Sequence, residues 1–577
     1  MNYSNFDNIK IIVDTLKAHG ISELVISPGG TNLVLVKSVE NDDFFNCYSV
    51  VDERSAAYYA IGVYLQKRSP VALICTSAQA TRNYIPGLTE AFYKKVPILA
   101  ITMEKHPRFT YQEYMQAPDQ TSLPRDCVKK SFELPFISDV NDMYYSGRVA
   151  NQAILELSKN GNGPIQIAVP WVDFPMKEIM PGTKIINRYR CTDVAHYKWD
   201  NKKILIVVGE HIPFEKSEIA EITDFCACTN TVVYTNHLSN FNNDFCVSGN
   251  LFLQTISKDE IEEIKPDIII SIGGQTGDYP FYLLFSKNTL SGIEHWRVCE
   301  DGEVVDTYDK LTRVYQGSIS EFFRNGKNTG DNSHDYLKLW KEKIDSRSTD
   351  LVLPFSNPSI AQYLHTQMPK DSIIQFSILN SLRIWNFFEL DNSIECYSNV
   401  GAFGIDGGMS TLIGQSVVTD KLCFMIIGDL AFFYDMNSLG IRDIKNNLRV
   451  LLINNNGGIE FKLHGEDREQ RDRYIAAANH FKTAKGWAEN CGFEYYSAKT
   501  MDEFITHSKK FLSESDKPIL LEAFVSDKDE SDAYNFILSA NSDDVATKEK
   551  LSKGMKDSLK SILGKERYAS IKKIIKG

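Results

Sequence analysis

The amino-acid sequence predicts an α/β protein built from three doubly wound, parallel-sheet domains. Short apolar runs that end in Pro, Gly or small polar residues alternate with stretches of helical spacing, which is typical of parallel sheets covered by helices. The chain has 577 residues, more than one hydrophobic core usually organises. Three domains of roughly 150–200 residues each fit this length.

The first domain is expected to span residues 1–182. Residues 24–27, 71–76 and 96–102 are short apolar runs and are predicted as strands, and residues 54–66 between them have helical spacing.

The central domain is expected at residues 190–335, after a polar boundary. Its clearest predicted strands are residues 203–208 and 267–272, and the second of these runs into Gly273-Gly274. The sequence from Gly273 to Gly277 is not a G-x-G-x-x-G motif, so no flavin cofactor is expected.

The third domain is expected at residues 345–535. Its predicted elements are strands at residues 372–376, 422–427 and 449–454, and a helix at residues 435–444. Residues 536–577 are rich in Lys and Ser and are predicted to form a C-terminal helical extension.

Composition excludes several classes of protein. The chain carries 63 Lys and Arg against 75 Asp and Glu, a net charge of −12, and the acidic residues are spread along it, so no nucleic-acid partner is expected. Its 11 cysteines include no C-x-x-C pair, which argues against zinc or redox motifs. The polar N-terminus is no signal peptide, and Gly428 and Asp429 interrupt the longest apolar run. A cytoplasmic location without a membrane partner is therefore expected.

The most informative residues follow two neighbouring predicted strands of the third domain. Gly428-Asp429 ends the first strand, and Asn454-Asn455 ends the next. Because the carboxyl ends of parallel strands open on the same crevice, these side chains should converge. A carboxylate, an amide oxygen and a backbone carbonyl suit Mg²⁺, with diphosphate oxygens and water completing the shell. Asp429, Asn455 and the carbonyl of Gly457 are therefore predicted to bind Mg²⁺.

Singly, Gly-Asp and Asn-Asn-Gly are more often turn residues. Together, with 24 residues between Asp429 and Asn454, they resemble the signature of thiamine-diphosphate enzymes, a Gly-Asp followed after about that interval by Asn-Asn. The resemblance implies thiamine diphosphate and Mg²⁺ as cofactors. It extends to residues 50–57, which look like the segment that carries the superfamily's glutamate.

Glu53 is the residue at that position. In the superfamily this glutamate hydrogen-bonds N1′ of the aminopyrimidine and favours the imino tautomer, whose nitrogen removes the C2 proton of the thiazolium. The resemblance thus implies that Glu53 is catalytic and acts through the cofactor. Taken alone, Glu53 is equally explained as an acid in the first turn of a helix, where the macrodipole favours it.

Longer matches in the first and third domains narrow this resemblance. The matching segments are Ser27-Pro28-Gly29, Asp52-Glu53-Arg54-Ser55-Ala56-Ala57, Cys75-Thr76-Ser77 with Asn83, Asn380-Ser381-Leu382, Ser398-Asn399, Gly401-Ala402, Gly404-Ile405-Asp406-Gly407, and Gly428-Asp429-Leu430 with Tyr434-Asp435-Met436-Asn437. They resemble the 2-succinyl-5-enolpyruvyl-6-hydroxy-3-cyclohexene-1-carboxylate synthases of menaquinone biosynthesis. The central domain is similar only in general character.

This resemblance implies further roles. Ile405, equally explicable as a core residue, would hold the cofactor in its bent form, and Phe461 would be an active-site aromatic. The substrate-side glutamine would be Gln116 or Gln120. The remaining residues implied to bind the cofactor are Asn83, Gly428, Asn454 and Gly458.

The departures from the family concern its substrates, 2-oxoglutarate and isochorismate, which it holds with several arginines because guanidinium binds both oxygens of a carboxylate. Each missing clamp would cost about 1.5–3 kcal/mol, so the chemistry is expected to be retained and the substrates to have changed. The altered positions are Gly30-Thr31 for Ser-Arg, Lys105-His106 for Asp-Arg, Trp385 and Val400 for arginines, and Glu460 for an apolar lid residue.

Other residues near the presumed pocket could hold a different acidic substrate, although each basic one is more often a solvated surface charge. These candidates are Arg82, Lys105, Arg108, Arg383, Lys462 and Gln116. His106 and His464 could move protons, but a structural role is commoner for either. The chain has no His-His pair, unlike pyruvate decarboxylases, which favours carbon–carbon bond formation over simple protonation.

The expected function is decarboxylation of a 2-oxo acid and transfer of the acyl-anion equivalent to an acceptor. The alternatives are the menaquinone-pathway synthase itself, a two-carbon ligase acting on a keto-sugar, and a plain decarboxylase. A catalytically idle scaffold is disfavoured because Glu53 and Asp429 are intact. The superfamily pattern implies a homodimer or homotetramer, with each cofactor between the first domain of one subunit and the third domain of another.

Overall fold

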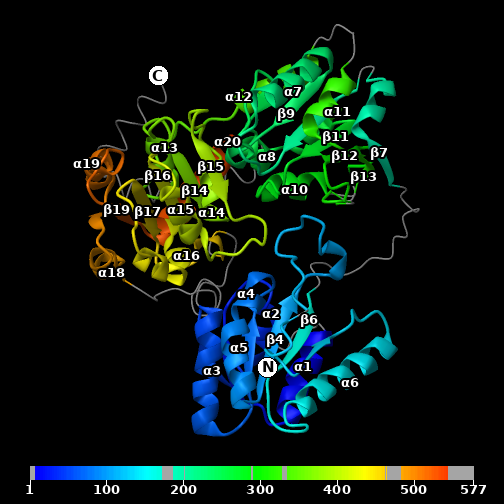
Figure 1. Cartoon of the computed structure of the whole chain (residues 1–577), viewed down its shortest axis with the longest axis vertical. Coiled ribbons are helices and arrows are strands. Elements are labelled where there is room, and N and C mark those ends of the chain that lie inside the picture. Colours follow the sequence, from blue (N-terminus) through cyan, green and yellow to red (C-terminus); the bar gives the residue numbers. More distant parts are fainter. Residues whose placement is uncertain are drawn as a thin grey trace. The chain divides into compact units, whose positions relative to one another are not determined.

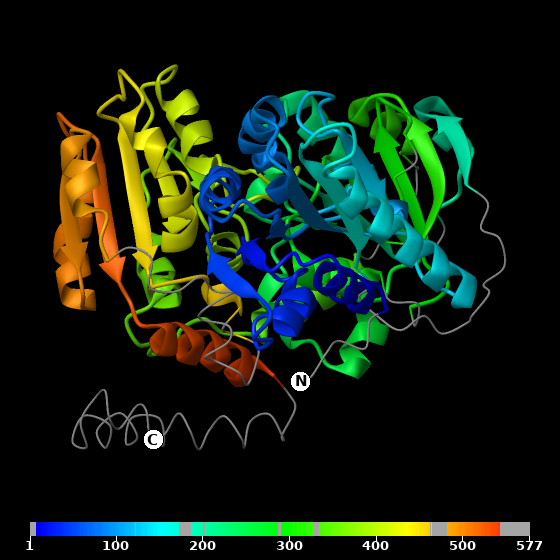
Figure 2. The ribbon, with the colours of Figure 1, turned by 90° about the horizontal axis from the view of Figure 1, so that it is seen from below.

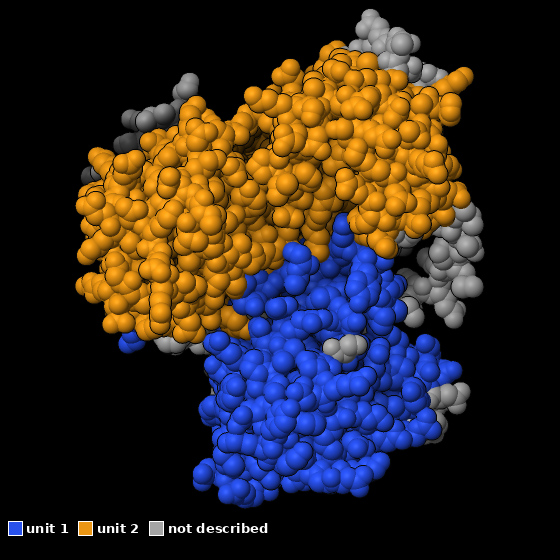
Figure 3. Space-filling view, in the orientation of Figure 1, with its two compact units in different colours: residues 1–181, 401–406, 456–482 blue, residues 182–400, 407–455, 483–577 orange. Residues whose placement is uncertain are grey.

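Three sheets, each with only parallel strand pairs, form the framework of the protein in the computed structural model (Figure 1). This confirms the predicted α/β fold class. The chain divides into two compact units, of residues 1–181, 401–406 and 456–482 and of residues 182–400, 407–455 and 483–577 (Figure 3). The structure describes residues 7–121, 123–171, 186–199, 202–286, 290–303, 305–308, 310–327, 334–461, 463 and 482–542.

The first sheet has the strand order β2-β1-β3-β4-β6-β5. Its strands are β1 (Glu23–Ile26), β2 (Asn46–Ser49), β3 (Val71–Cys75), β4 (Ile98–Glu104), β5 (Lys130–Glu133) and β6 (Ile165–Pro170). Its helices are α1 (Asp7–Ala18), α2 (Leu33–Val39), α3 (Glu53–Lys67), α4 (Gln79–Asn83), α5 (Ile85–Lys94) and α6 (Val140–Glu156).

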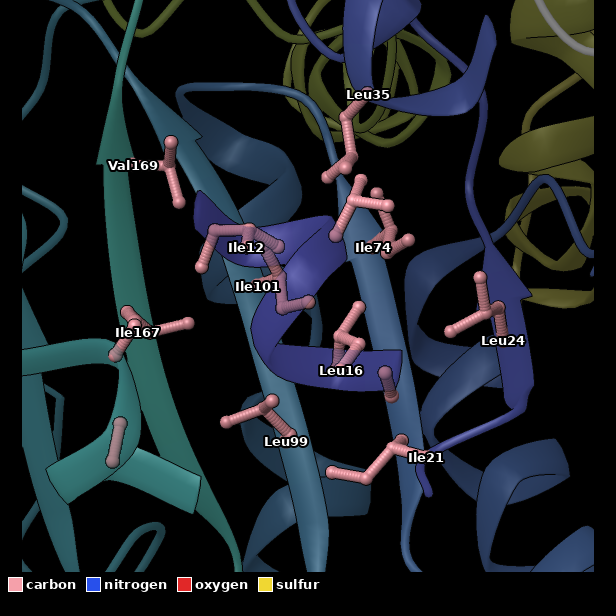
Figure 4. Packing of buried hydrophobic residues seen from close by; sticks show 14 of the residues in the cluster. Ile12, Leu16, Ile21, Leu24, Leu35, Ile74, Leu99, Ile101, Ile167 and Val169 are labelled. Atoms are coloured by element: carbon pink, nitrogen blue, oxygen red, sulfur yellow. The ribbon is translucent and has the colours of Figure 1, made fainter. Parts of the chain in front are cut away.

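Alternate residues of these strands bury apolar side chains on opposite faces of the sheet. Ile74 and Ile101 pack with Ile12 and Leu16 of α1 in one core (Figure 4). Leu73, next to Ile74, belongs to a second core with residues of α3 and α5. The first domain is therefore covered by helices on both faces, as predicted for a doubly wound sheet.

The central sheet has the order β10-β9-β8-β11-β12-β13-β7. Its strands are β7 (Asn187–Arg190), β8 (Ile204–Val208), β9 (Thr231–Tyr234), β10 (Cys246–Val247), β11 (Ile268–Ile272), β12 (Glu294–Cys299) and β13 (Leu311–Gln316). Its helices are α7 (Lys216–Cys228), α8 (Asn250–Thr255), α9 (Lys258–Ile264), α10 (Tyr279–Phe285), α11 (Ile319–Gly326) and α12 (Asp335–Asp345).

The third sheet has the order β15-β14-β16-β17-β19-β18, and Figure 2 shows its strands side by side with α19 packed along β18 and β19. Its strands are β14 (Ile373–Phe376), β15 (Glu395–Ser398), β16 (Cys423–Gly428), β17 (Leu448–Asn454), β18 (Glu494–Ala498) and β19 (Ile519–Phe524). Its helices are α13 (Asn357–Leu364), α14 (Asn380–Trp385), α15 (Gly408–Ser416), α16 (Asp429–Tyr434), α18 (Lys485–Asn490), α19 (Met501–Phe511) and α20 (Asp527–Asn541).

The predicted helix at residues 435–444 is wrong in type and extent. The α-helix after β16 is α16, and a short 3-10 helix, Met436–Gly440, follows it. Asn437, Ser438 and Gly440 favour an α-helix weakly, which explains why the helical pattern does not continue. The predicted domain bounds remain a prediction, and most of the predicted extension at residues 536–577 lies outside the described residues.

Hydrogen bonds join the central and third sheets within one compact unit. The imidazole Nε2 of His237 lies 2.8 Å from the Trp385 carbonyl oxygen. The amide of Asn240 bonds both the carbonyl and the N–H of Cys396, each at 2.8 Å. Burial lowers the pKa of His237 to about 4, so its ring is neutral at physiological pH. Over the described part of the chain, no helix is long and apolar enough to cross a membrane.

Candidate cofactor and metal site

The structure brings Asp429, Asn454 and Asn455 together at the carboxyl ends of two neighbouring strands of the third sheet. β16 and β17 are neighbouring parallel strands, and Gly428 pairs with Ile453. Asp429 follows as the first residue of α16, and Asn454 is the last residue of β17. All three polar side chains are buried. The convergence predicted from their spacing is therefore present in the fold.

The oxygen atoms at these strand ends suit the binding of a hard cation beside a phosphate. The buried Oδ1 of Asn455 has no hydrogen-bond partner among the described residues, so it is open to a ligand that accepts its lone pairs. Asp429 Oδ1 accepts a hydrogen bond from the N–H of Leu430 at 2.8 Å. A Cβ added to Gly428 would meet no described atom within 4 Å, so this backbone leaves room for a ligand. These residues fit Mg²⁺ and a diphosphate.

The backbone after Asn455 turns sharply. Asn456 and Gly457 have positive φ angles of 66° and 149°, and the second favours glycine. Gly457 and Gly458 precede the 3-10 helix Ile459–Phe461. Gly457 belongs to a different compact unit from Asp429 and Asn455. Its carbonyl is therefore a metal ligand by prediction only. Lys462 and His464 lie outside the described residues.

Glu53 is the first residue of α3, and its surroundings differ from those of a surface helix acid. Asp52 is the N-cap, and its Oδ1 accepts hydrogen bonds from the N–H groups of Arg54 at 2.9 Å and Ser55 at 3.4 Å. Capping therefore does not need Glu53. The Glu53 side chain is buried, whereas an acid that serves only the macrodipole is normally exposed.

Two buried groups feel the charge of Glu53. Burial, and after it the Glu53 carboxylate, raises the pKa of the Cys75 thiol well above its usual range. Burial is also the main reason why the pKa of Tyr84 is raised, and Glu53 adds to it. Glu53 is therefore within electrostatic range of Cys75, the last residue of β3, and of Tyr84 at the α4–α5 junction.

The segment that carries Ile405 packs in the same compact unit as Glu53. A Cβ added to Gly404 would meet Oδ1 of Asp406 and lie 3.1 Å from the Cβ of Gln79, so the backbone of this segment approaches α4 closely. Ile405 is half-buried beside it. Gln79 begins α4 and Asn83 ends it, which places two of the predicted cofactor-binding residues near one short helix.

The two candidate glutamines have different surroundings. Gln120 is buried; its Oε1 accepts a hydrogen bond from the N–H of Ala78 at 2.6 Å, and its Nε2 donates to the Met103 carbonyl at 2.5 Å. Gln120 therefore braces the turn after β3 against β4. Gln116 is half-buried and has a positive φ of 59°.

The candidate basic residues already interact with other groups. Arg82 is exposed and donates to the Asp119 carbonyl at 2.5 Å. The Lys105 ammonium lies 3.9 Å from the centre of the Trp171 ring, a cation–π distance. Arg383 is half-buried, and its charge partly offsets the burial that raises the pKa of Asp278. Arg108 is exposed and lies over Phe109.

His106 has a structural environment. Its ring stacks on Phe136 with 4.1 Å between ring centres, and its Nδ1 accepts a hydrogen bond from the N–H of Arg108 at 3.1 Å. Burial lowers its pKa, which favours the neutral ring.

Three positions at which the resemblance implies an arginine in the family hold buried, uncharged side chains here. Trp385 and Val400 are packed in the core. Thr31 is also buried, and its Oγ1 lies 2.5 Å from Thr76 Oγ1 and accepts from the N–H of Ser77 at 3.0 Å. None of these three side chains can form an ion pair with a substrate carboxylate.

Glu104 is a functional candidate that the sequence reasoning missed. It is the last residue of β4 and is buried, and its Oε1 has no hydrogen-bond partner within the described residues. Burial, followed by the charge of Glu133, raises its pKa to about 8. The available signal was an acid at the end of an apolar run.

We expect Glu104→Gln to make stability less dependent on pH. Between the ordinary pKa of 4.5 and the raised value of about 8, folding retains a proton that the unfolded chain releases. Wild-type stability should therefore fall as pH rises through this window, by on the order of 1.4 kcal/mol per pH unit at most. Urea unfolding at pH 5.5 and 7.5 measures this. An equal change in both proteins would show that Glu104 does not titrate there.

Comparison with known proteins first defines the class. Residues 8–123 match the model of the thiamine pyrophosphate enzyme, N-terminal TPP binding domain. Together with the three parallel sheets, this match makes the chain a thiamine-pyrophosphate enzyme. Proteins named 2-succinyl-5-enolpyruvyl-6-hydroxy-3-cyclohexene-1-carboxylate synthase are similar over nearly their whole length.

The relative from Phocaeicola vulgatus is 32% identical over 90% of this chain and 96% of its own. Those from Bacteroides thetaiotaomicron and Flavobacterium psychrophilum are 31% and 29% identical, with 96% and 98% of their lengths covered. The chain belongs to the 2-succinyl-5-enolpyruvyl-6-hydroxy-3-cyclohexene-1-carboxylate synthase family.

Proposed function

We propose that the protein decarboxylates a 2-oxo acid and adds the resulting acyl-anion equivalent to an acceptor, using thiamine diphosphate and Mg²⁺. The observation that carries this proposal is the convergence of Asp429 with Asn455, whose buried oxygen lacks a partner among the described residues. When bound, thiamine diphosphate supplies a nucleophilic carbon and accepts the electron pair that is left by loss of CO₂.

In this proposal Asp429, Asn455 and the Gly457 carbonyl hold Mg²⁺, which anchors the diphosphate. Gly428, Asn454 and Gly458 shape the backbone around it. Glu53 would exchange a proton with N1′ of the aminopyrimidine when the cofactor is bound, and the burial of its side chain would keep water away from it.

Asn83, Ile405 and Phe461, which belong to the other compact unit, are the remaining residues proposed to bind the cofactor. Ile405 would hold the cofactor bent, since the half-buried side chain lies on a segment packed against α4.

The names of the relatives favour the synthase reaction itself, so 2-oxoglutarate and isochorismate are the first substrates to test. A second candidate, a different substrate pair, is supported by Thr31, Trp385 and Val400, which are buried and uncharged at positions of family arginines. In both cases Arg82, Lys105, Arg383, Lys462 and Gln116 are the proposed substrate-side residues.

CO₂ release from a panel of 2-oxo acids, with thiamine diphosphate and Mg²⁺ present, separates these candidates. For the synthase we expect turnover of 2-oxoglutarate that isochorismate accelerates, together with formation of a succinyl adduct. Preference for another 2-oxo acid would support changed substrates. If no 2-oxo acid releases CO₂, the proposed function is wrong.

We also propose a cytoplasmic homodimer or homotetramer. Large side chains are exposed on α3, at Tyr58, Tyr59 and Leu65, and on α5, at Tyr93. Association with another chain would remove such apolar surface from water. A molar mass in solution that equals one chain would contradict this assembly.

A further inference from the structure

Glu522 connects the end of β17 to a later part of the chain. It lies on β19, between β17 and β18, where it pairs with Leu452 on one side and Ser497 on the other. Its side chain is fully buried. A buried carboxylate requires compensation by hydrogen bonds or charges, so the groups around it define its role.

The donors to Glu522 come from three segments. Oε1 accepts from Asn454 Nδ2 at 2.7 Å. Oε2 accepts from the hydroxyls of Thr483 at 2.8 Å and Tyr495 at 2.7 Å, and from the N–H of Ala484 at 3.1 Å. A carboxylate offers about four acceptor positions, so these four uncharged donors occupy its hydrogen-bonding capacity.

This network determines the orientation of the Asn454 amide. A carboxylate can only accept hydrogen bonds, so the NH₂ group of Asn454 must face Glu522, and its oxygen must point the opposite way. The Asn454 carbonyl also accepts from the N–H of Val525 at 3.0 Å. Asn454, which directly precedes Asn455, is thus bonded through its side chain to Glu522 of β19 and through its backbone to Val525 just after β19.

Thr483 and Ala484 donate hydrogen bonds to the same Glu522 carboxylate from the point where the chain returns from the other unit. Residues 456–482 are grouped with the other compact unit, so Asn454 and Thr483 flank the two points where the chain passes between the units. Glu522 therefore accepts hydrogen bonds both from Asn454, which directly precedes Asn455, and from Thr483 and Ala484, which follow residue 482.

We propose that Glu522 is a positioning residue for the metal and diphosphate site: it orients the Asn454 amide and thereby sets the direction in which Asn455 leaves β17. This inference rests on the proposed function, because Asn455 matters only if the site binds Mg²⁺ and thiamine diphosphate. Mutation of a residue that orients a metal ligand through a hydrogen bond typically lowers metal affinity by about 10- to 100-fold.

The test measures the Kd of thiamine diphosphate in the presence of Mg²⁺ by calorimetry on the full chain, well below the unfolding temperature. Glu522→Leu should raise this Kd on the order of tenfold or more. Tyr495→Phe is the matched control, since it removes one donor from Oε2 but leaves the bond to Asn454. Its Kd should stay at the wild-type value even if its Tm falls.

If Glu522→Leu does not fold, the proposal can be tested by exchanging the acid and the amide between positions 454 and 522. Asn454→Asp places two carboxylates face to face and should weaken binding strongly. Adding Glu522→Gln restores one donor and one acceptor with the total charge unchanged, so the double variant should bind better than Asn454→Asp alone.

Different results overturn different statements. Wild-type Kd values for both Glu522→Leu and Asn454→Asp, equal weakening in Tyr495→Phe, or no recovery in the double variant would overturn the role of Glu522. A wild-type protein that fails to bind thiamine diphosphate with Mg²⁺ would instead overturn the proposed function.

Discussion

Glu53→Gln should leave thiamine diphosphate bound while turnover nearly stops. Glutamine keeps the size of the buried side chain but cannot exchange a proton with N1′ of the aminopyrimidine. General acid–base groups typically contribute about 10²- to 10⁴-fold to rate, and we expect a loss of that order in kcat. CO₂ release and the Kd of the cofactor, measured on the same preparation, separate the two effects. Undiminished turnover would remove Glu53 from the mechanism.

Asp52→Asn is the matched control for this prediction. Asp52 is the adjacent carboxylate, and it caps α3 through the N–H groups of Arg54 and Ser55. Asparagine caps helices about as well as aspartate, so both stability and turnover should stay close to wild type. A similar loss of turnover in Asp52→Asn would indicate that the start of α3, rather than the Glu53 carboxylate, is what the reaction requires.

The inner strands of the third sheet could be predicted because a strand that is buried on both faces must be apolar along its length. β16 and β17 are buried along nearly their whole length and are almost continuously apolar, as strands of a covered parallel sheet must be. β2 and β5 are edge strands with half-exposed, polar residues. Their pairing depends on the neighbouring strand, and no apolar run or alternation marks them.

In the site, too, residues marked by the neighbouring sequence could be predicted, whereas residues whose environment is formed by distant segments could not. Asp429 and Asn454 could be predicted because one directly follows, and the other ends, an apolar strand that is recognisable in the sequence. Glu104 also lies at the end of a strand, but neither its burial nor that of Glu522 could be predicted, since an isolated acid in a strand looks the same in sequence whether it is exposed or buried. Their roles depend on Glu133, Thr483 and Tyr495, which only the fold brings close.

Asp429→Ala should abolish Mg²⁺-dependent cofactor binding while the protein stays folded. Removal of one partner from a buried ion pair typically costs about 3–5 kcal/mol, which corresponds to a Kd of thiamine diphosphate at least about 100-fold higher. Stability without cofactor should not fall in the same way. Burial, with a contribution from the charge of Asp429, raises the pKa of Glu530 to about 8, so the variant loses a repulsive charge.

This combination of weaker binding and unreduced stability distinguishes a ligand site from a structural carboxylate. Asp443→Asn is a suitable control, because Asp443 is exposed between β16 and β17 and has a positive φ of 61°, which asparagine tolerates. It should change neither Kd nor Tm. If Asp429→Ala binds thiamine diphosphate as the wild type does, or if its loss of binding follows a loss of Tm, then Asp429 does not hold the metal. The convergence of β16 and β17 would then need another explanation.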